Sequence, residues 1–274
     1  MTKQLFSVLA LALLILSSCN KEEAITELTE TTTSTDFLKM EQLYDDIEYE
    51  ADYRMEEKSG TFEDGKYTKD DDCPTLTWSA PPGTFPNTLV IDFGTGCTSA
   101  SGSTKAGQIV VNQSDPMPTV GAVRTITLVN FSINGIQIEG TKSLTNNGPV
   151  GPAQRSFTRT LVGGQVTFLN GDVATKDATR TLSQLDGLGT DTFIDDIFAI
   201  TGGSQGVNRN GVPYSTNITE PLIKERNCHW LISGVRDMTF GPFSRSIDYG
   251  NGFCDPFAVV TNGQGQSHII NLNN

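Results

Sequence analysis

Cysteine thiols are the most reactive side chains in this 274-residue sequence, which contains five of them and only two histidines. Four cysteines form two pairs of similar spacing, Cys73 with Cys97 and Cys228 with Cys254. The midpoint of each pair falls on a turn sequence containing Gly and Pro, and residues equidistant from a hairpin turn face each other at a distance that a disulfide can bridge. Of three possible pairings, hairpin symmetry therefore predicts these two bonds. A four-thiolate metal site is disfavoured because no Cys-x-x-Cys pair is present.

A short motif of Ile, Asp, an aromatic residue, Gly, any residue and Gly precedes the second cysteine of each pair. Its acidic residues, Asp92 and Asp248, could form a carboxylate pair for catalysis or cation binding. A turn is the more economical interpretation, because Asp accepts hydrogen bonds from nearby backbone amides and glycine adopts positive φ at low cost. We therefore predict that the motif is structural and that its two copies form a partial internal repeat.

The two histidines, His229 and His268, are too few for a multi-histidine zinc or iron site. His229 is predicted to be a hydrogen-bonded strand residue. Ser267 and His268 are adjacent, so a strand would point them to opposite faces and separate a nucleophile from its base. The stretch from Gly202 to Gly206 has Gly-x-Ser-x-Gly spacing, but it lacks the following helix of a nucleophile elbow and the Lys of a phosphate-binding loop. The sequence therefore predicts no catalytic residue, no metal and no cofactor.

Acidic clusters and tryptophans offer the remaining candidates for a site. Two clusters are interpreted as solvated charge, namely Asp70 to Asp72, and Asp186 with Asp191, Asp195 and Asp196. The alternatives are calcium binding, for which no ligand spacing is recognisable, and a glycosidase carboxylate pair, which nothing identifies. Trp78 and Trp230 lie in predicted strands near cysteines and are expected to pack in the core rather than bind sugars.

The first residues have the organisation of a secretory signal, with Lys3 followed by about twelve apolar residues from Leu5 to Leu16. This stretch is too short to span a bilayer as a helix. The tetrapeptide Leu16-Ser17-Ser18-Cys19 resembles a bacterial lipobox, which implies removal of residues 1–18 and attachment of lipid to Cys19. Two or three acyl chains would hold the mature protein on a membrane, since each buried methylene contributes about 0.8 kcal/mol.

A second targeting feature follows the lipobox directly. Lys21, Glu22 and Glu23 resemble the basic and acidic residues with which Bacteroidota send lipoproteins to the outer face of the outer membrane. The resemblance implies an outer-membrane, lipid-anchored protein that faces the cell exterior.

Most of the formal charge of −13 lies in the segment after the lipobox. Residues 20–72 contain 18 acidic and 6 basic residues, a balance of −12, whereas residues 73–274 contain 14 acidic and 12 basic residues, a balance of −2. We interpret residues 19–72 as an acidic tether that its charge keeps solvated and extended. Nucleic acid binding is disfavoured, because a phosphate-binding surface needs a basic patch.

Within the tether, the Thr- and Glu-rich stretch from Ala24 to Thr35 is predicted to be disordered, and Asp36 is predicted to cap a short amphipathic helix. The apolar residues of that helix recur at spacings of three and four: Phe37, Met40, Tyr44, Ile47, Ala51 and Met55. Such a stripe packs on the folded domain or docks on a partner.

Residues 73–274 are predicted to form a single all-β domain. Twelve short runs rich in Thr, Val, Ile and Phe indicate strands. Two-residue turn signals separate several of them: Asn134-Gly135, Gly163-Gly164, Asn170-Gly171, Asn210-Gly211 and Asn262-Gly263. Such pairs close antiparallel hairpins, so the prediction is a meander of about twelve strands in a sandwich, a barrel or a broad curved sheet.

Several motifs of this domain together resemble a family of uncharacterised Bacteroidota lipoproteins. They are the opening from Cys73 to Trp78, the stretch from Leu89 to Cys97, Asn208 to Gly211, and the ending from Ser246 to Cys254. The resemblance covers most of residues 73–274 and implies an address and a β-rich fold, but no activity.

The resulting functional expectation is a membrane-anchored surface or periplasm-facing lipoprotein with a non-enzymatic binding or envelope-structural role. Its partners would be the membrane, through the lipid on Cys19, and a protein or glycan ligand. The alternatives are a glycan-binding accessory lipoprotein of a polysaccharide uptake system and a hydrolase that uses Asp or Glu.

Overall fold

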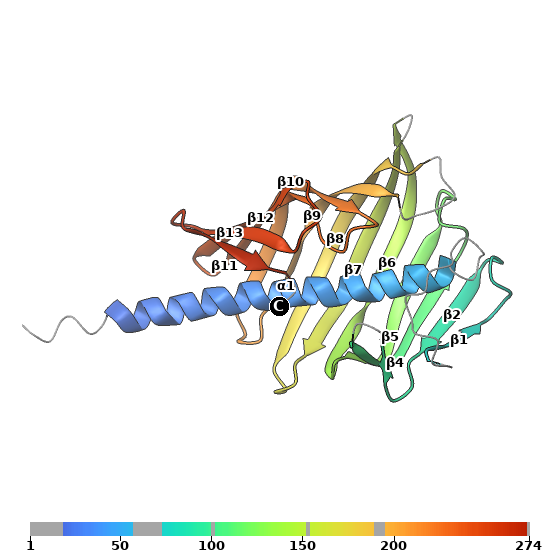
Figure 1. Ribbon diagram of the computed structural model, residues 1–274, viewed down its shortest axis with the longest axis horizontal. Coiled ribbons are helices and arrows are strands. Elements are labelled where there is room, and N and C mark those ends of the chain that lie inside the picture. Colours follow the sequence, from blue (N-terminus) through green and yellow to red (C-terminus); the bar gives the residue numbers. More distant parts are fainter. Residues whose placement is uncertain (1–18, 57–72, 100–101, 152–153, 189–194, 273–274) are drawn as a thin grey trace, which may run out of the picture.

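One long helix lies across the strands of a single antiparallel sheet (Figure 1). The structure is a computed structural model that describes residues 19–56, 73–99, 102–151, 154–188 and 195–272. The predicted signal sequence 1–18 and the acidic run from Asp70 to Asp72 lie outside these residues. In the described part of the chain, no helix is long and apolar enough to cross a membrane.

The elements in chain order are one helix and fourteen strands. They are α1 (Cys19–Glu56), β1 (Thr75–Trp78), β2 (Asn87–Asp92), β3 (Cys97–Thr98), β4 (Thr104–Gln113), β5 (Val123–Ile133), β6 (Ile136–Gly151), β7 (Gln154–Thr167), β8 (Val173–Asp186), β9 (Ile197–Val207), β10 (Pro213–Glu225), β11 (Ser233–Phe240), β12 (Phe243–Asn251), β13 (Phe257–Asn262) and β14 (Ser267–Asn271).

Consecutive strands pair with one another, in the order β1-β2-β4 and then from β5 to β14 in sequence, while the short β3 pairs with β4. The predicted antiparallel meander is therefore confirmed. Of the three arrangements that the sequence left open, the broad curved sheet is the one found. The sheet is not closed into a barrel, and β1 and β14 form its two ends in the described chain.

Tight turns make this topology possible. At the turn between β5 and β6, Asn134 and Gly135 both have positive φ, at 51° and 79°. That combination suits the twist of a two-residue hairpin. Asn170-Gly171, Asn210-Gly211 and Asn262-Gly263 also lie at hairpin turns, as predicted.

The predicted turn at Gly163-Gly164 is wrong, because these glycines lie inside the continuous strand β7. The register between β7 and β8 shifts between Leu161 and Gly164, which identifies a β-bulge. A Cβ at Gly164 would lie 2.4 Å from the backbone oxygen of Lys176, so glycine is required by close approach of the next strand. Gly-Gly here bends a strand and does not end it.

Helix α1 corrects a second prediction. Neither a disordered stretch from Ala24 to Thr35 nor a short helix beginning at Asp36 is found, because the helix runs over 38 residues from Cys19. No Gly or Pro interrupts residues 19–56, and Thr33 is buried, where its hydroxyl accepts a hydrogen bond of 2.8 Å from Asn208. Tertiary contacts of this kind override the low helix propensity of a Thr-rich stretch.

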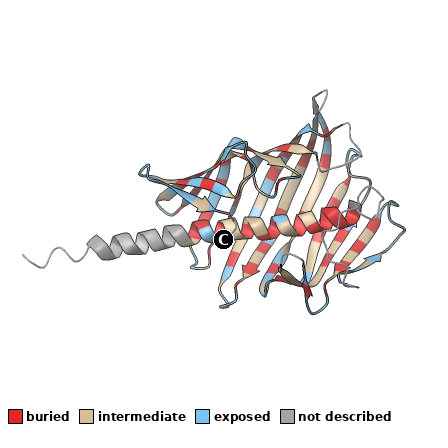
Figure 2. Cartoon of the chain, viewed as in Figure 1, coloured by how far each residue is buried: buried red, intermediate tan, exposed pale blue. Residues whose placement is uncertain are grey.

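The predicted apolar stripe packs on the sheet, as one of its two interpretations required. All six of its residues are at most 5% exposed, and buried residues recur along α1 where it lies over the strands (Figure 2). Five of the six join a cluster with strands β2 to β8, and Phe37 joins a second cluster with strands β7 to β13. The helix therefore contributes to both apolar clusters of the core.

Both predicted disulfides are present. Cys73 bonds to Cys97 with a Cα–Cα distance of 5.9 Å, and Cys228 bonds to Cys254 with 5.8 Å. The second hairpin turns between Phe240 and Phe243, as symmetry predicted, although β11 begins at Ser233 and not at the cysteine. In the chain-entropy model, each bridge stabilises the fold by roughly 3 kcal/mol.

Candidate functional site

The face of the sheet that α1 covers is basic. All twelve Lys and Arg residues of the β-domain are described, and nine of them form ion pairs with carboxylates of α1. The nine are Lys105, Arg124, Lys142, Arg159, Lys176, Arg180, Arg209, Arg226 and Arg236. The acidic segment is thus not solvated as predicted, since Asp36, Glu48, Glu50 and Asp52 are buried.

The ion pairs follow the path of the helix across the strands. Asp36 bonds to Arg209 at the turn between β9 and β10, with 2.7 Å between its Oδ1 and the arginine Nε. Two turns from its other end, Glu50 bonds to Lys105 of β4 at 2.7 Å. The sheet curves around the helix, because carboxylates of α1 reach strands as far apart in order as β4 and β11.

Glu41 is shared by three cations. It forms ion pairs with Lys176 and Arg180 of β8 and with Arg236 of β11. Arg236 is 1% exposed, and burial lowers its pKa to about 10. Burial, together with the like charges of Arg180 and Arg236, lowers the pKa of Lys176. One carboxylate is therefore balancing a cluster of buried positive charge.

Glu48 has two cationic partners, Lys142 of β6 at 2.5 Å and Arg159 of β7 at 3.0 Å. Burial alone would raise the pKa of Glu48, but the attraction of Arg159 and Lys142 outweighs it and holds the pKa below its ordinary value. Asp52 similarly pairs with Arg124 of β5 and with Arg226, the latter at 2.7 Å. Each of these carboxylates ties two segments of the β-domain to the helix.

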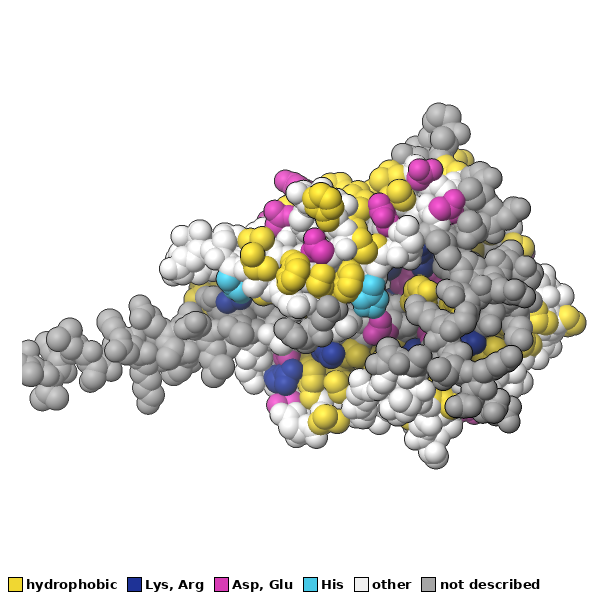
Figure 3. Space-filling view, in the orientation of Figure 1, with side chains coloured by type: hydrophobic (Ala, Val, Ile, Leu, Met, Phe, Trp, Pro, Cys, Tyr) yellow, Lys and Arg dark blue, Asp and Glu magenta, His cyan; other side chains and the backbone are white. Residues whose placement is uncertain are grey.

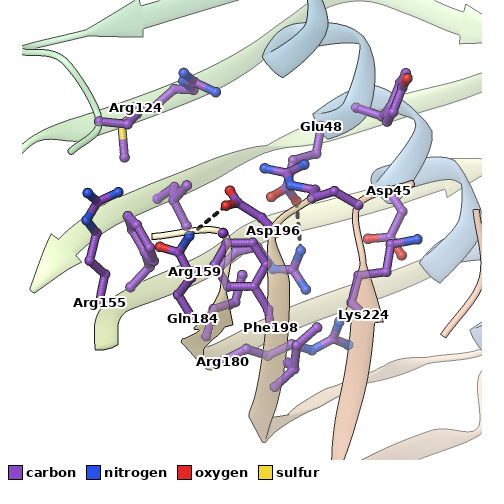
Figure 4. Close-up of a pocket in the computed structure, with 18 of the residues that line it drawn as sticks. Asp45, Glu48, Arg124, Arg155, Arg159, Arg180, Gln184, Asp196, Phe198 and Lys224 are labelled. Atoms are coloured by element: carbon purple, nitrogen blue, oxygen red, sulfur yellow. Dashed lines mark hydrogen bonds and ion pairs between the residues drawn. The ribbon is translucent and has the colours of Figure 1, made fainter. Parts of the chain in front are cut away.

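A cavity of about 710 Å³ lies beside this ion-pair network, between α1 and strands β4 to β11. The space-filling view shows basic and acidic side chains together in a hollow near a histidine (Figure 3). Asp45 and Glu48 project toward the space from α1, while Arg159, Gln184 and Phe198 come from the strands opposite (Figure 4). The volume is typical of a small-molecule pocket, which falls in the range of about 300–1,000 Å³.

Strand register arranges the floor of the cavity in rows. One row crosses β6, β7 and β8 through Leu144, Arg159 and Arg180, which are successive cross-strand partners. The adjacent row is apolar and crosses four strands. Its members are Phe157, Leu182, Ile200 and Leu222. Because side chains alternate between faces, these neighbouring rows point to the same side of the sheet.

Two titratable groups at the far side of the cavity have perturbed acidities. Asp196 is half-buried and accepts a hydrogen bond of 2.6 Å from Gln184, and burial raises its pKa to about 6. Lys224 donates hydrogen bonds to the backbone oxygens of Cys228 and His229, and burial lowers its pKa to about 8. Both groups change charge within two pH units of neutrality.

The two candidate carboxylates of the repeated motif lie on different strands, Asp92 on β2 and Asp248 on β12. Asp92 accepts a hydrogen bond of 2.8 Å from the amide of Gly94, and Asp248 accepts one of 2.9 Å from the amide of Gly250, which agrees with the structural interpretation of the repeated motif. Gly94 and Gly250 both have positive φ. In the described residues, no cluster of three or more His, Cys, Asp or Glu side chains could hold a metal ion.

Three interpretations of individual residues are wrong. His229 and Trp230 lie in a turn before β11 and not in a strand, and His229 is exposed at the cavity. Trp230 is half-buried and joins neither core cluster, whereas Trp78 of β1 is half-buried and packs against the first cluster, as predicted. Asp196 lines the cavity and is not a solvated loop residue, while Asp186 and Asp195 are exposed as predicted and Asp191 lies outside the described residues.

The three targeting residues Lys21, Glu22 and Glu23 lie in the first turns of α1, whose first residue is Cys19; the structure describes their backbone but not their side chains. Lipidation and export therefore stay predictions.

The sequence analysis missed the basic face and the cavity. The sequence contains a signal for the basic face: Lys142, Lys176 and Arg180 interrupt what would otherwise be alternating apolar residues in β6 and β8. None of the twelve short runs identified in the sequence falls within either strand. A row of cations on an interior sheet face, together with a carboxylate-rich helix, would have identified the pairing.

Comparisons with known proteins add no relative: no protein-family model, curated protein or solved structure matches this chain. The likeness to Bacteroidota lipoproteins therefore stays a resemblance of motifs.

Replacement of Glu41 by Gln tests the ion-pair network. Removing one partner of a buried charge pair costs about 3–5 kcal/mol, because the remaining charges are left uncompensated. We expect a loss of this size in the free energy of unfolding of Glu41→Gln, measured by urea denaturation. Asp237→Asn, at an exposed position of β11, is the control and should change stability by less than about 1 kcal/mol. Equal, small effects of the two substitutions would contradict the role of Glu41 in neutralising buried cations.

The pKa of Asp196 predicts a pH dependence of stability. Its pKa is raised from 3.8 to about 6 in the folded protein, so the folded state holds the proton more tightly than the unfolded state does. Stability from this group is then present below about pH 4 and is lost as the pH rises through 6. The free energy of unfolding of the wild type, measured by urea denaturation relative to that of Asp196→Asn, should decrease between pH 4 and pH 6.5. A constant difference across that range would contradict the assignment.

Proposed function

We propose that this protein is a lipid-anchored, extracytoplasmic binding protein that holds a small molecule in the cavity between α1 and the sheet. The observation that carries the proposal is the cavity itself, with its volume of about 710 Å³, its apolar row and its convergent charged groups. A mostly apolar pocket with a few placed polar groups is the usual form of a ligand site.

The anchor and the address rest on other features. The lipobox-like residues before Cys19 and the Lys21-Glu22-Glu23 sequence favour attachment to the outer membrane with exposure on the cell surface. Two disulfides are consistent with an oxidising compartment outside the cytoplasm. Helix α1 begins at the cysteine that would carry the lipid and ends beside the cavity. In this proposal, α1 is both the connection to the membrane and one wall of the binding site.

Binding is favoured over hydrolysis because of what the carboxylates in the cavity do. Of the five carboxylates that line the cavity, the two that face the paired arginines, Glu41 and Glu48, are held in ion pairs with two or three cations each, so these two neutralise charge and are not free to act as an acid, base or nucleophile. Recognition of a glycan by stacking is disfavoured by the half-burial of Trp78 and Trp230. The protein is therefore proposed to have no enzymatic activity.

Uptake of a neutral, environment-sensitive dye tests the cavity. We expect Nile red to bind the purified protein with 1:1 saturation and a blue-shifted emission. Leu144→Trp, which places an indole in the cavity, should weaken this binding at least tenfold. Val162→Trp, at a position of β7 that is 64% exposed, is the matched control and should leave it unchanged. Binding that is absent, or that is insensitive to Leu144→Trp, would contradict the proposed function.

Cell fractionation tests the anchor. The native protein should partition with outer membranes, and mass spectrometry should find an acylated first residue at Cys19. Cys19→Ala should move the protein to the soluble fraction, because no acyl chains would then hold it on the bilayer. An unacylated amino terminus in the native material would refute this part of the proposal.

A further inference from the structure

Two arginines face each other on the floor of the cavity. Arg159 of β7 and Arg180 of β8 are direct cross-strand partners, and both line the cavity. Side chains in this relation start about 5 Å apart, and like charges so placed destabilise a sheet. Each guanidinium has its own carboxylate on α1, Glu48 for Arg159 and Glu41 for Arg180. The pair therefore brings two adjacent sets of N–H donors to the floor of the cavity.

Positive charge exceeds negative charge at this point. Glu41 pairs with Lys176 and with the guanidinium groups of Arg180 and Arg236, and Asp45 is a second carboxylate that acts on both arginines. Three buried N–H groups, the Nε of Arg180 and the Nε and Nη2 of Arg236, have no hydrogen-bond partner among the described residues. Buried donors on a charged group that lack an acceptor are costly, so they mark a place where an anion is stabilised.

The same excess holds for the cavity as a whole. Among the described residues, its lining contains seven Lys and Arg side chains against five carboxylates, and Asp52, which is not in the lining, pairs with two of the seven, Arg124 and Arg226. The carboxylates are Glu41, Asp45, Asp46, Glu48 and Asp196. Glu41 and Glu48 are already occupied by cations, and Asp45 is exposed on α1. A cationic ligand would meet the larger number of like charges.

The apolar row lies directly beside the arginine pair. Phe157 and Leu182 are each two residues along their strands from Arg159 and Arg180, and Ile200 and Leu222 continue the row onto β9 and β10. At about 4.8 Å between strands, the row extends roughly 14 Å from β7 to β10. An elongated apolar group fits this strip while a polar group at its end reaches the guanidinium pair.

From these observations we infer that the cavity binds an amphiphile with one anionic head group, which lies against Arg159 and Arg180, and an apolar chain, which lies along Phe157, Leu182, Ile200 and Leu222. This inference rests on the proposed binding function and adds the class of ligand. A carboxylate and a phosphate monoester share the required chemistry, because both accept paired hydrogen bonds from guanidinium groups.

Calorimetric titration with four twelve-carbon probes, each used below its critical micelle concentration, tests the inference. The probes are dodecanoate, dodecyl phosphate, dodecanol and dodecylammonium. At pH 7.5, at least one anionic probe should bind about tenfold or more tightly than dodecanol, since charge-assisted hydrogen bonds contribute at least that factor. The dodecanoate and dodecyl phosphate titrations then distinguish a fatty-acid-type head group from a phosphate-type one. Dodecylammonium should bind more weakly than dodecanol.

Two substitutions locate the head group. Arg159→Gln should reduce affinity for the anionic probe about tenfold and leave dodecanol binding unchanged, and dodecanol binding also reports that the variant is folded. Arg209→Gln is the matched control, because Arg209 pairs with α1 but does not line the cavity, and it should leave both affinities within about twofold of wild type.

The outcomes separate this inference from the proposed function. Equal affinity of wild type for dodecanoate, dodecyl phosphate and dodecanol would overturn the anionic head group, and so would tighter binding of dodecylammonium, while either result would leave a small-molecule cavity in place. An anion preference that survives Arg159→Gln would overturn the location of the head group. Failure of all four probes and of Nile red would overturn the proposed function as well.

Discussion

Neither α1 nor the sheet can bury its charges without the other. Five carboxylates of α1 meet nine cations of the sheet, and most of these side chains are almost completely removed from water. Removing such charges from water costs several kcal/mol per ion unless a partner and hydrogen bonds replace the lost hydration. The apolar stripe of α1 supplies the driving force for docking, and the ion pairs determine where along the sheet each turn of the helix lies.

This constraint explains the shape of the molecule. An antiparallel meander with one polar face can remain open to water, but here the basic face would be repulsive without the helix. Docking α1 against it leaves both a closed core, around the stripe from Phe37 to Met55, and an incompletely filled region beside Glu41 and Glu48. The cavity thus results from the same pairing that holds the fold together. A bound anion would neutralise positive charge that the carboxylates of α1 leave unbalanced.

Local signals in the sequence were sufficient for the meander, its hairpins and the disulfides, because turn chemistry and pairing symmetry act over short distances. Asn134-Gly135 and the Cys228–Cys254 hairpin are examples. Signals that depend on distant partners were misinterpreted: the acidic residues from Asp36 to Asp52 have the composition of a solvated tether, and only the facing strands make them buried. Net charge also concealed the site, since a balance of −2 in residues 73–274 gives no indication that nine of twelve cations lie on one face.

Native-state hydrogen exchange followed by mass spectrometry tests most directly whether the charged helix is an integral part of the fold. Amides in the docked part of α1, residues 36–55, should exchange only with the slowest class and at the same rate as those of β5 to β8, because opening the helix would expose the cation rows. Rapid exchange of this segment while the strands remain protected would show that the helix is a detachable tether, and would contradict the mutual dependence of helix and sheet.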